Sequence, residues 1–187
     1  PEFEPQRASM LTLVTALAVS DAIRSLTGLE AVIKWPNDIV CGGKKVVGIL
    51  TEMSTEAEWI RYVIVGIGIN VNMDGFPGEL GKTATSLKLE LGRGVKRSPL
   101  VAAVMNAFEK YYALFETAGD LSGLVDTYNL WSANTGRQVR VLDPAGEYQG
   151  EALGIDSQGA LLVKCSEGEV KSVISGEVSV RGVYGYV

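Results

Sequence analysis

KWPNDIVCGGKKVVGIL, residues 34–50, is the stretch that decides the fold. Its apolar runs are short, and the Gly42-Gly43 pair between two of them is typical of two strands joined by a tight turn. The same hairpin carries unusual chemistry for so short a segment, because Lys34, Asp38 and Lys45 all belong to it. We therefore expect a charged site on the edge of a sheet.

The alternation of side chains places Asp38 and Lys45 on one face of this hairpin. With the turn at Gly42-Gly43, Val40 faces Lys45. Asp38 then faces Val47, and Asp38 and Lys45 are diagonal neighbours roughly 7–8 Å apart between backbones. Such a spacing leaves room for a phosphate or a metal ion. An ordinary solvent-facing hairpin with surface lysines is the open alternative.

The run VIVGIGINV, residues 63–71, predicts a strand with two unequal faces. One face is apolar, whereas Gly66, Gly68 and Asn70 share the other. Glycine inside a strand often marks the close approach of a ligand or of another backbone. The Asn70 carboxamide has the donor and acceptor that complement the edge of adenine. Close packing of the long N-terminal helix against the glycines is the alternative that stays open.

Hydrophobic periodicity predicts the remaining elements of the first part of the chain. Apolar residues crowd the stretch from Pro5 to Leu26, which predicts a buried helix that ends near Gly28. Strands are expected at residues 31–34, 38–41, 45–53 and 61–72. Ser98-Pro99 opens a second helix, and a third covers Asp120 to Trp131. The second helix carries an apolar stripe made of Leu100, Val104, Phe108, Tyr112 and Phe115.

The pattern changes after residue 134, where five short strand-like runs are separated by turn residues. About 50 residues with this spacing indicate a small SH3-like barrel. We therefore predict an α+β fold, in which a mixed sheet with packed helices (residues 1–134) is followed by an SH3-like β-barrel (residues 135–187).

Composition excludes several classes of function. The net charge of −5 argues against general binding to nucleic acid or to an anionic membrane, and the apolar runs are expected to be too short to span a bilayer. The two cysteines, Cys41 and Cys165, lack a metal-type spacing and indicate a reducing, cytoplasmic compartment. The chain has no histidine, which excludes Ser-His-Asp and Cys-His catalysis and most zinc chemistry.

Three separated motifs together resemble the catalytic domain of the biotin protein ligases, or biotin–[acetyl-CoA-carboxylase] ligases. They are KWPNDIV (34–40), GKKVVGILTE (43–52) and VGIGINVN (65–72). The likeness continues through TATSLKLELG (83–92) and the helix that follows Ser98. It resumes in the predicted barrel with GRQVRVL, GEALGIDSQGALLV and SGEVSVRG.

The resemblance implies a two-step reaction that uses ATP, Mg²⁺ and biotin. The biotin carboxylate attacks the α-phosphorus of ATP, which gives biotinyl-5′-AMP and pyrophosphate. A lysine amine of a biotin carboxyl carrier protein then takes the biotinyl group and releases AMP. A carboxylate needs no base to act as a nucleophile, so the absence of histidine fits this chemistry.

The resemblance also implies roles for residues on the ATP side. Lys34 would reach the phosphates, while Asn37 and Asp38 would position Mg²⁺-ATP, with Asp38 as the metal-side carboxylate. Asp38 would also orient the incoming lysine of the acceptor. Asn70 would bind adenine, and Arg181 would approach the nucleotide from the barrel.

On the biotin side, Lys45 matches the catalytic lysine of the family, which contacts the carboxyl end of biotin and the acyl phosphate. Gly48, Ile49 and Leu50 would line the biotin pocket through their backbone and aliphatic atoms. A fixed ammonium group at Lys45 would hold two anions together in the first step and stabilise the departing AMP in the second.

The chain departs from the family pattern at its start. The glycine- and arginine-rich loop that closes over biotin does not precede Pro5, and no DNA-binding domain is present, so we expect an N-terminally truncated ligase without transcriptional control. A non-catalytic fragment that binds nucleotide or carrier protein is the alternative. A lipoate or octanoyl transferase and a plain barrel interaction module fit less well. Exposed sheet edges are compatible with a homodimer.

Overall fold

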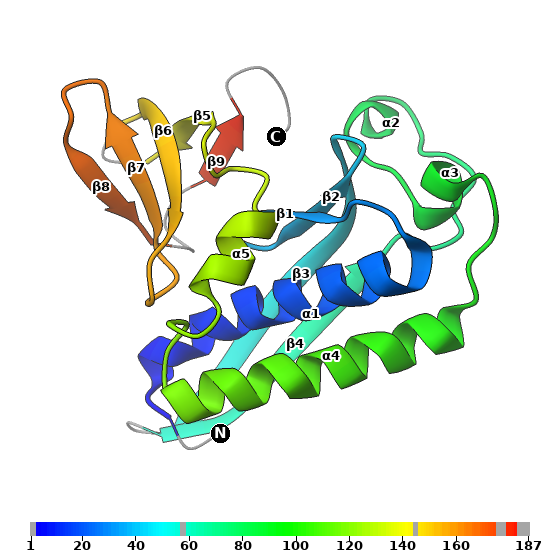
Figure 1. Ribbon diagram of the computed structural model, residues 1–187, viewed down its shortest axis with the longest axis horizontal. Helices are drawn as coiled ribbons and strands as arrows, with labels where there is room; N and C mark the ends of the chain where they lie inside the picture. The colour runs from blue at the N-terminus through cyan, green and yellow to red at the C-terminus, as the bar shows by residue number, and fades with distance from the viewer. Residues whose placement is uncertain (1–2, 57–58, 144–145, 175–178, 183–187) are drawn as a thin grey trace.

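The computed structural model describes residues 3–56, 59–143, 146–174 and 179–182. A four-stranded sheet carries helix α1 on one face, and α4 packs along α1 (Figure 1). A second, five-stranded sheet lies beside one end of this assembly, next to β1 and α5. The α+β class is confirmed.

Helix α1 (Met10–Thr27) follows a short 3-10 turn, η1 (Pro5–Ser9). Twelve of its residues are buried, because the helix lies between the sheet and α4. Gly28 ends it with a left-handed φ of 77°, and the Gly28 N–H donates to the Arg24 carbonyl. The predicted buried helix with a glycine stop is confirmed.

The segment Pro5–Thr27 is nevertheless long and apolar enough to cross a membrane, so the expectation that every apolar run would be too short is wrong. Burial explains the composition: 67% of its most apolar window is buried inside the protein. An all-round apolar helix is the usual core element of a folded domain.

The first sheet has the order β1-β2-β3-β4. Its strands are β1 (Val32–Lys34), β2 (Asp38–Cys41), β3 (Lys44–Glu56) and β4 (Trp59–Ile69). All pairings between these strands are antiparallel. The parallel component of the predicted mixed sheet consists, within the described residues, of two isolated bridges, Ile33 with Ser132 and Lys45 with Ala84.

The register of the β2–β3 hairpin differs from the prediction on one side. Val40 pairs with Lys45, as predicted. Asp38, however, pairs with Gly48 instead of Val47. The ladder shifts within β2 because β3 contains one extra residue there, a β-bulge that alternation alone does not reveal.

The segment between β4 and α4 contains two short helices that the sequence did not predict, α2 (Leu80–Thr83) and α3 (Leu87–Leu91). The Ser86 hydroxyl caps α3 by accepting from the Leu89 N–H. Helix α4 (Arg97–Ala118) buries Leu100, Val104, Tyr111 and Phe115. Two members of its predicted stripe, Phe108 and Tyr112, are only partly buried, and their rings stack on each other. Helix α5 (Val125–Trp131) begins five residues later than predicted.

The second sheet has the order β8-β7-β6-β5-β9, with every pairing antiparallel. Its strands are β5 (Gln138–Leu142), β6 (Tyr148–Ile155), β7 (Leu161–Cys165), β8 (Val170–Val173) and β9 (Ser179–Gly182). The five predicted strands are all present, and the SH3-like prediction is confirmed. The division at residues 134 and 135 stays a prediction, and residues 183–187 of the predicted barrel range lie outside the described residues.

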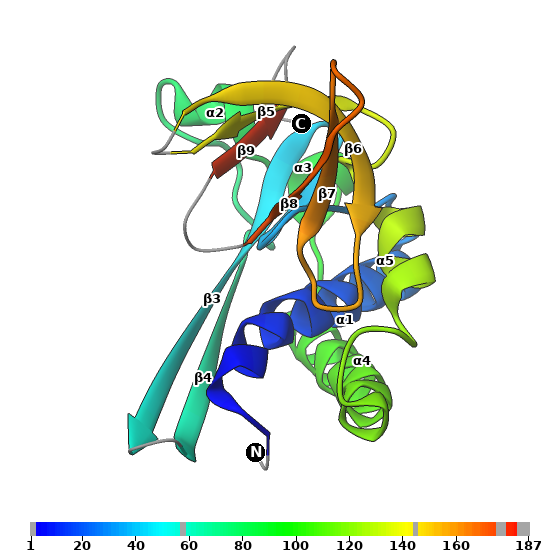
Figure 2. The same cartoon turned by 90° about the vertical axis from the view of Figure 1, so that its left-hand side faces the viewer.

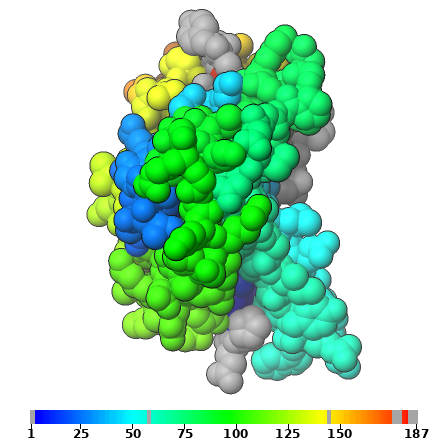
Figure 3. Space-filling model, turned by 90° about the vertical axis from the view of Figure 1, so that its right-hand side faces the viewer, coloured from blue at the N-terminus to red at the C-terminus, as the bar shows by residue number. Residues whose placement is uncertain are grey.

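The β3–β4 hairpin extends well past the helices that cover its base (Figure 2). From another side, it stands apart from α4, with the N-terminal segment visible between them (Figure 3). Near its tip the hairpin exposes the apolar side chains of Met53, Trp59, Tyr62 and Ile64.

Candidate active site

The charged residues of the β2–β3 hairpin meet in one place. Lys34 ends β1 and pairs in the sheet with Asp38, the first residue of β2. Asp38 in turn pairs with Gly48 of β3. Lys34 and Asp38 are each only 8% exposed, which is rare for charged side chains. The alternative of an ordinary solvent-facing hairpin is therefore wrong.

Lys45 and Asp38 contact each other directly. Lys45 Nζ lies 2.5 Å from Asp38 Oδ1, with the side chains 39% and 11% exposed. The expected gap for a phosphate or metal between them is absent, because the long lysine side chain reaches across the strand pair. Gly48 makes this possible, since a Cβ at Gly48 would lie 3.1 Å from Lys45 Cε and Nζ. An anion must therefore meet this ion pair from outside.

Lys34 is a cation held where charge is costly. Burial lowers the pKa of its ammonium group, and the neighbouring Lys45 and Arg181 lower it further, whereas Asp38 acts in the opposite direction. A bound anion would relieve the repulsion among these cations. The electrostatics thus favour a polyanionic ligand beside Lys34.

Arg181 reaches this neighbourhood from the second sheet. It lies in β9, opposite Arg140 of β5, and its side chain is exposed. Its charge acts on Lys34, so the barrel brings a cation to the edge of the first sheet. The sequence predicted this approach only through the family resemblance.

Asn37 has a mainly structural place. Its Nδ2 donates to the Ile49 carbonyl over 2.9 Å, and the Ile49 N–H donates to the Asn37 carbonyl over 2.9 Å. These bonds clamp the start of β2 to β3. Ile49 itself is 2% exposed, because its side chain lies on the α1 face of the sheet. Of the three predicted biotin-pocket residues, only Gly48 and Leu50 share the outer face.

That outer face lacks side chains at Gly48, Gly66 and Gly68. Gly48 pairs with Gly68, and Leu50 pairs with Gly66. A Cβ at Gly66 or Gly68 would meet only a backbone oxygen, at 3.6 Å. Both glycines are exposed, so they do not serve the packing of α1, and that alternative is excluded.

Helix α1 lies against the opposite face of the sheet. The Thr12 and Thr51 hydroxyls, one on α1 and the other on β3, are hydrogen-bonded there over 2.8 Å. The glycine face is left accessible beside the charged cluster.

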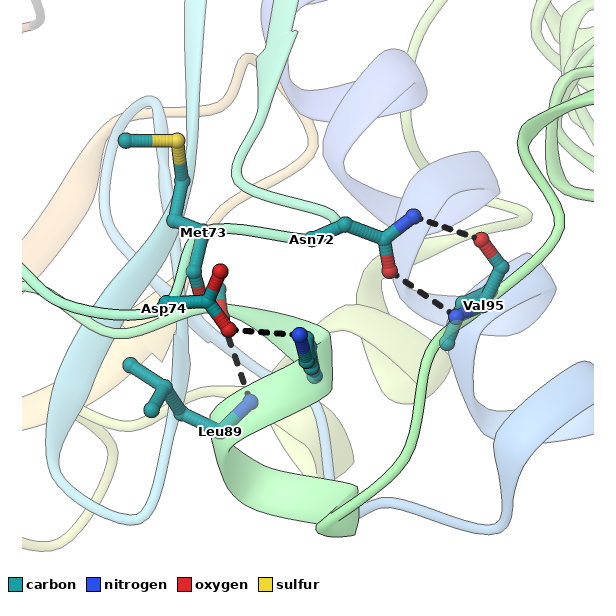
Figure 4. Close-up of polar contacts among 7 residues, drawn as sticks. Asn72, Met73, Asp74, Leu89 and Val95 are labelled. Carbon is teal, nitrogen blue, oxygen red and sulfur yellow. Dashed lines mark hydrogen bonds and ion pairs between the residues drawn. The ribbon is translucent and has the colours of Figure 1, made fainter.

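Asn70 and Asn72 differ in how much of their side chains remains available. The Asn72 amide is fully engaged with the backbone of Val95, donating to its carbonyl and accepting from its N–H, each over 2.9 Å (Figure 4). Asn70 bonds through its backbone to Val46 and Leu87. Within the described residues its side chain makes no hydrogen bond, so its carboxamide is available to a ligand.

The sequence missed one set of residues near the site. Trp35, between Lys34 and the Asn37-Asp38 pair, is fully buried and bonded to both Asn134 and Gly159. The presence of a tryptophan within the charged motif was a signal in the sequence, but it did not show that Asn134 and Gly159 would be its hydrogen-bond partners.

Donor chemistry limits what metal this site could hold. Among residues 3–56, 59–143, 146–174 and 179–182, no three His, Cys, Asp or Glu side chains are grouped to hold an ion. Asp38 is the carboxylate beside the cationic cluster, and it is paired with Lys45. The residues therefore fit only a Mg²⁺ ion that arrives on phosphates, which is the usual mode for this metal.

Known proteins show the same two modules. Residues 1–70 match the model of the biotin/lipoate A/B protein ligase family, and residues 135–181 match the biotin protein ligase C terminal domain. The apo biotin protein ligase from Aquifex aeolicus superimposes with a TM-score of 0.84 at 30% identity, covering 95% of this chain and 77% of that one. The chain belongs to the biotin protein ligase family.

Curated members of this biotin protein ligase family are longer. The bifunctional ligase/repressor BirA of Bacillus subtilis is 41% identical over 182 residues, which cover 95% of this chain but 55% of BirA. The biotin–[acetyl-CoA-carboxylase] ligase of Paracoccus denitrificans is 33% identical over 165 residues, covering 84% of this chain and 67% of that protein. The chain thus spans about half the length of the BirA relatives.

Proposed function

We propose that this chain carries the ATP-side half and the catalytic lysine of a biotin protein ligase. The observation that supports this proposal is the cluster of buried Lys34 and Asp38 with the half-exposed Lys45. The charge of Arg181 acts on Lys34, and a glycine-lined face lies beside the cluster. Such a cluster suits a polyphosphate, and the flat glycine surface suits an extended, uncharged ring system. A related ligase from Aquifex aeolicus, 30% identical, has been crystallised with biotin and ATP.

In the first step the biotin carboxylate attacks the α-phosphorus of ATP. A carboxylate oxygen–phosphorus bond forms, the bond to the bridging oxygen breaks, and pyrophosphate leaves. Lys45 lies at the exposed rim of the cluster, where its ammonium can contact both anions. Lys34 neutralises phosphate charge from its buried position, and Arg181 does so from the barrel.

In the second step a lysine amine attacks the acyl carbon of biotinyl-5′-AMP. The new amide bond forms, the bond from the acyl carbon to the AMP oxygen breaks, AMP leaves with the bonding electrons, and the proton of the amine passes to water. Asp38 is the carboxylate beside the reacting centre, so we assign to it the orientation of the incoming amine. The ion pair with Lys45 holds the Asp38 carboxylate in place before the acceptor arrives.

The ligand-binding roles follow from accessibility. Asn70 binds adenine through its free carboxamide, and Gly48 and Leu50 line the biotin side on the outer face. The contribution of Ile49 is limited to its backbone, and Asn37 holds the hairpin together. Mg²⁺, when bound with ATP, neutralises phosphate charge, and Asp38 is the carboxylate that would reach it.

The acceptor is a biotin carboxyl carrier protein domain. Relatives named biotin–[acetyl-CoA-carboxylase] ligase support this assignment. The amine nucleophile would approach from the side of Lys45, whose side chain is 39% exposed, because Asp38 beside it is largely buried.

The experiment that tests the proposal compares Lys45→Ala with Lys44→Ala, a neighbour whose Nζ donates to the Gly81 carbonyl. The rate of pyrophosphate exchange should fall strongly in Lys45→Ala, by the equivalent of about 2–4 kcal/mol of lost transition-state stabilisation. The rate should change little in Lys44→Ala. Binding of biotin and of Mg-ATP is measured separately by calorimetry. Nucleotide binding without biotin binding or exchange would favour a non-catalytic fragment, and no binding of either ligand would refute the proposal.

A further inference from the structure

We propose that Trp35 is a positioning residue. It fixes the barrel, through the β6–β7 turn, relative to Lys34, the lysine assigned to the nucleotide phosphates. This inference rests on the proposed function and goes beyond it, because Trp35 contacts no substrate in it. The main evidence is that Trp35, which is fully buried, donates hydrogen bonds to two segments that are distant in the chain. The Trp35 N–H donates to Asn134 Oδ1 over 2.8 Å, and its indole Nε1–H donates to the Gly159 carbonyl over 3.1 Å.

The first of these bonds holds the end of β1. Asn134 is 1% exposed and lies in the segment that leads from α5 into the barrel. This segment runs beside β1, since the Ala133 N–H donates to the Ile33 carbonyl over 2.7 Å. Lys34 is therefore flanked on both sides by residues bonded to the connection.

The second bond holds the barrel itself. Gly159 lies in the β6–β7 turn, which the Asp156 carboxylate braces by accepting from the Gln158 and Ala160 N–H groups. Gly159 has a φ of 82°, and a Cβ there would lie 3.1 Å from Leu121 and 3.2 Å from Leu13. The turn is thus inserted against α1 and the residues before α5, and it has little freedom to move.

A separate contact fixes the same turn from α5. Asn129 Oδ1 accepts from the Ile155 N–H over 2.8 Å, and Asn129 Nδ2 donates to the Ile155 carbonyl over 3.4 Å. Gly154 leaves the space for this amide, because a Cβ there would lie 2.6 Å from it. The Leu121 N–H also donates to the Ser157 carbonyl. We call these contacts and the Trp35–Gly159 bond the barrel seat.

The barrel seat determines where Arg181 lies. Arg181 is carried by β9, at the edge of the second sheet, and it acts electrostatically on Lys34 of the first. A small rotation of the barrel about the turn would move this guanidinium relative to the lysine. Trp35 links Lys34 to the barrel, since it is next to Lys34 in the chain and its indole is hydrogen-bonded to the β6–β7 turn. It acts on nucleotide binding through these two cations.

The test measures Mg-ATP and biotin binding by calorimetry in Trp35→Phe, which removes the indole N–H. We expect Mg-ATP affinity to fall about tenfold, the effect of one lost buried hydrogen bond, while biotin affinity stays within about twofold. Trp59→Phe, at the exposed hairpin tip, is the matched control and should change neither. Equal ATP affinity in wild type and Trp35→Phe would overturn the inference, whereas a wild type that binds no ATP would refute the proposed function instead.

A double-mutant cycle with Arg181→Ala separates positioning from general loss of packing. If Trp35 acts through the barrel, the losses of ATP affinity in Trp35→Phe and Arg181→Ala should combine to less than their sum, since the position that Trp35 helps to set matters only while the Arg181 guanidinium is present. Additive losses would overturn the inference. Should Trp35→Phe fail to fold, Asn129→Ala loosens the barrel seat from α5 without touching Trp35 or Lys34, and the same cycle with Arg181→Ala applies.

Discussion

The two ends of the first sheet depart from the usual pattern of burial in opposite ways, since one end buries charged side chains and the other exposes apolar ones. At the β1–β2 end, Lys34 and Asp38 are charged and almost fully buried. Along the outer face and tip of the β3–β4 hairpin, Leu50 is 62% and Trp59 is 79% exposed. Soluble proteins seldom tolerate either situation without a reason, because buried charge and exposed apolar surface are both costly.

The difference teaches what each end is built to meet. The charged end is supported by its neighbours, through the Lys45–Asp38 pair and through Trp35, which bonds the barrel. Its cations suit an anionic ligand. The outer face combines glycines with exposed apolar side chains such as Leu50, and it suits an apolar ligand or chain segment. The first end therefore governs stability and electrostatics together, whereas the second should govern binding alone.

The largest expected effect is on the covered face of the sheet. Leu17→Ala, in the fully buried middle of α1, should lower the free energy of unfolding by about 2–5 kcal/mol, because it leaves a cavity. Leu50→Ala on the outer face should change it by no more than about 0.5 kcal/mol. Urea denaturation of both variants is the measurement. A comparable loss in Leu50→Ala would mean that the outer face is not open in solution.

At the charged end, Asp38→Asn removes the anion that offsets Lys34 and Lys45. The free energy of unfolding should fall by about 1–3 kcal/mol, because the buried Lys34 and the half-exposed Lys45 lose the carboxylate beside them. Glu79→Gln is the matched control, since Glu79 pairs with Lys82 in full exposure and such pairs contribute little. Thermal unfolding of both variants is the measurement. An equal loss of stability in Asp38→Asn and Glu79→Gln would contradict the expectation that the pair at the charged end stabilises the fold more than the exposed pair.

Gly66→Ala examines the outer face with a single methyl group. Its Cβ would touch only the Leu50 carbonyl, at 3.6 Å, so the stability should not fall. Binding of biotin or of Mg-ATP should weaken about tenfold if a ligand lies on this face. Calorimetric titration of both ligands is the check, and unchanged affinities for both would leave the glycines without a binding role.

The smallest effect is a proton linkage at Lys34. Its pKa is lowered in the folded chain, mainly by burial, so between that pKa and the ordinary lysine value the unfolded chain binds more protons and stability rises with pH. A bound polyphosphate raises this pKa again. ATP binding should therefore take up a fraction of a proton and weaken as the pH rises through this window.

Calorimetry in buffers of different ionisation enthalpy measures this proton uptake. Lys34→Met is the control and should abolish it. Uptake that persists in Lys34→Met would assign the linkage to another group.

Local patterns predicted most elements of this protein. The buried helix α1, the glycine turn of the hairpin and the five strands of the barrel follow from periodicity and turn residues within about a dozen positions. The short helices α2 and α3 were missed, because four or five residues carry too little periodicity to be recognised. The β-bulge in β3 was missed for a similar reason, since an extra residue leaves no mark on composition.

The site was predicted in its members more than in its geometry. Lys34, Asp38 and Lys45 were singled out on this short segment, and the predicted common face of Asp38 and Lys45 is confirmed by their direct contact. The direct ion pair between Lys45 and Asp38 was not predicted. Strand alternation gives the distance between backbones, whereas the long lysine side chain reaches across that distance. The inward position of Ile49 follows from the alternation itself, which sets it opposite to Gly48 and Leu50.

The sequence by itself determined which segments form helices and strands, and which charged residues share the hairpin, because these properties depend on near neighbours in the chain. Only the tertiary structure decided how deeply Lys34 is buried, what Trp35 bonds, and where Arg181 arrives. Those features join residues as much as 124 positions apart, as the Trp35 and Gly159 pair does. No local preference encodes such a contact, since it exists only once both sheets have formed and packed against the same helix.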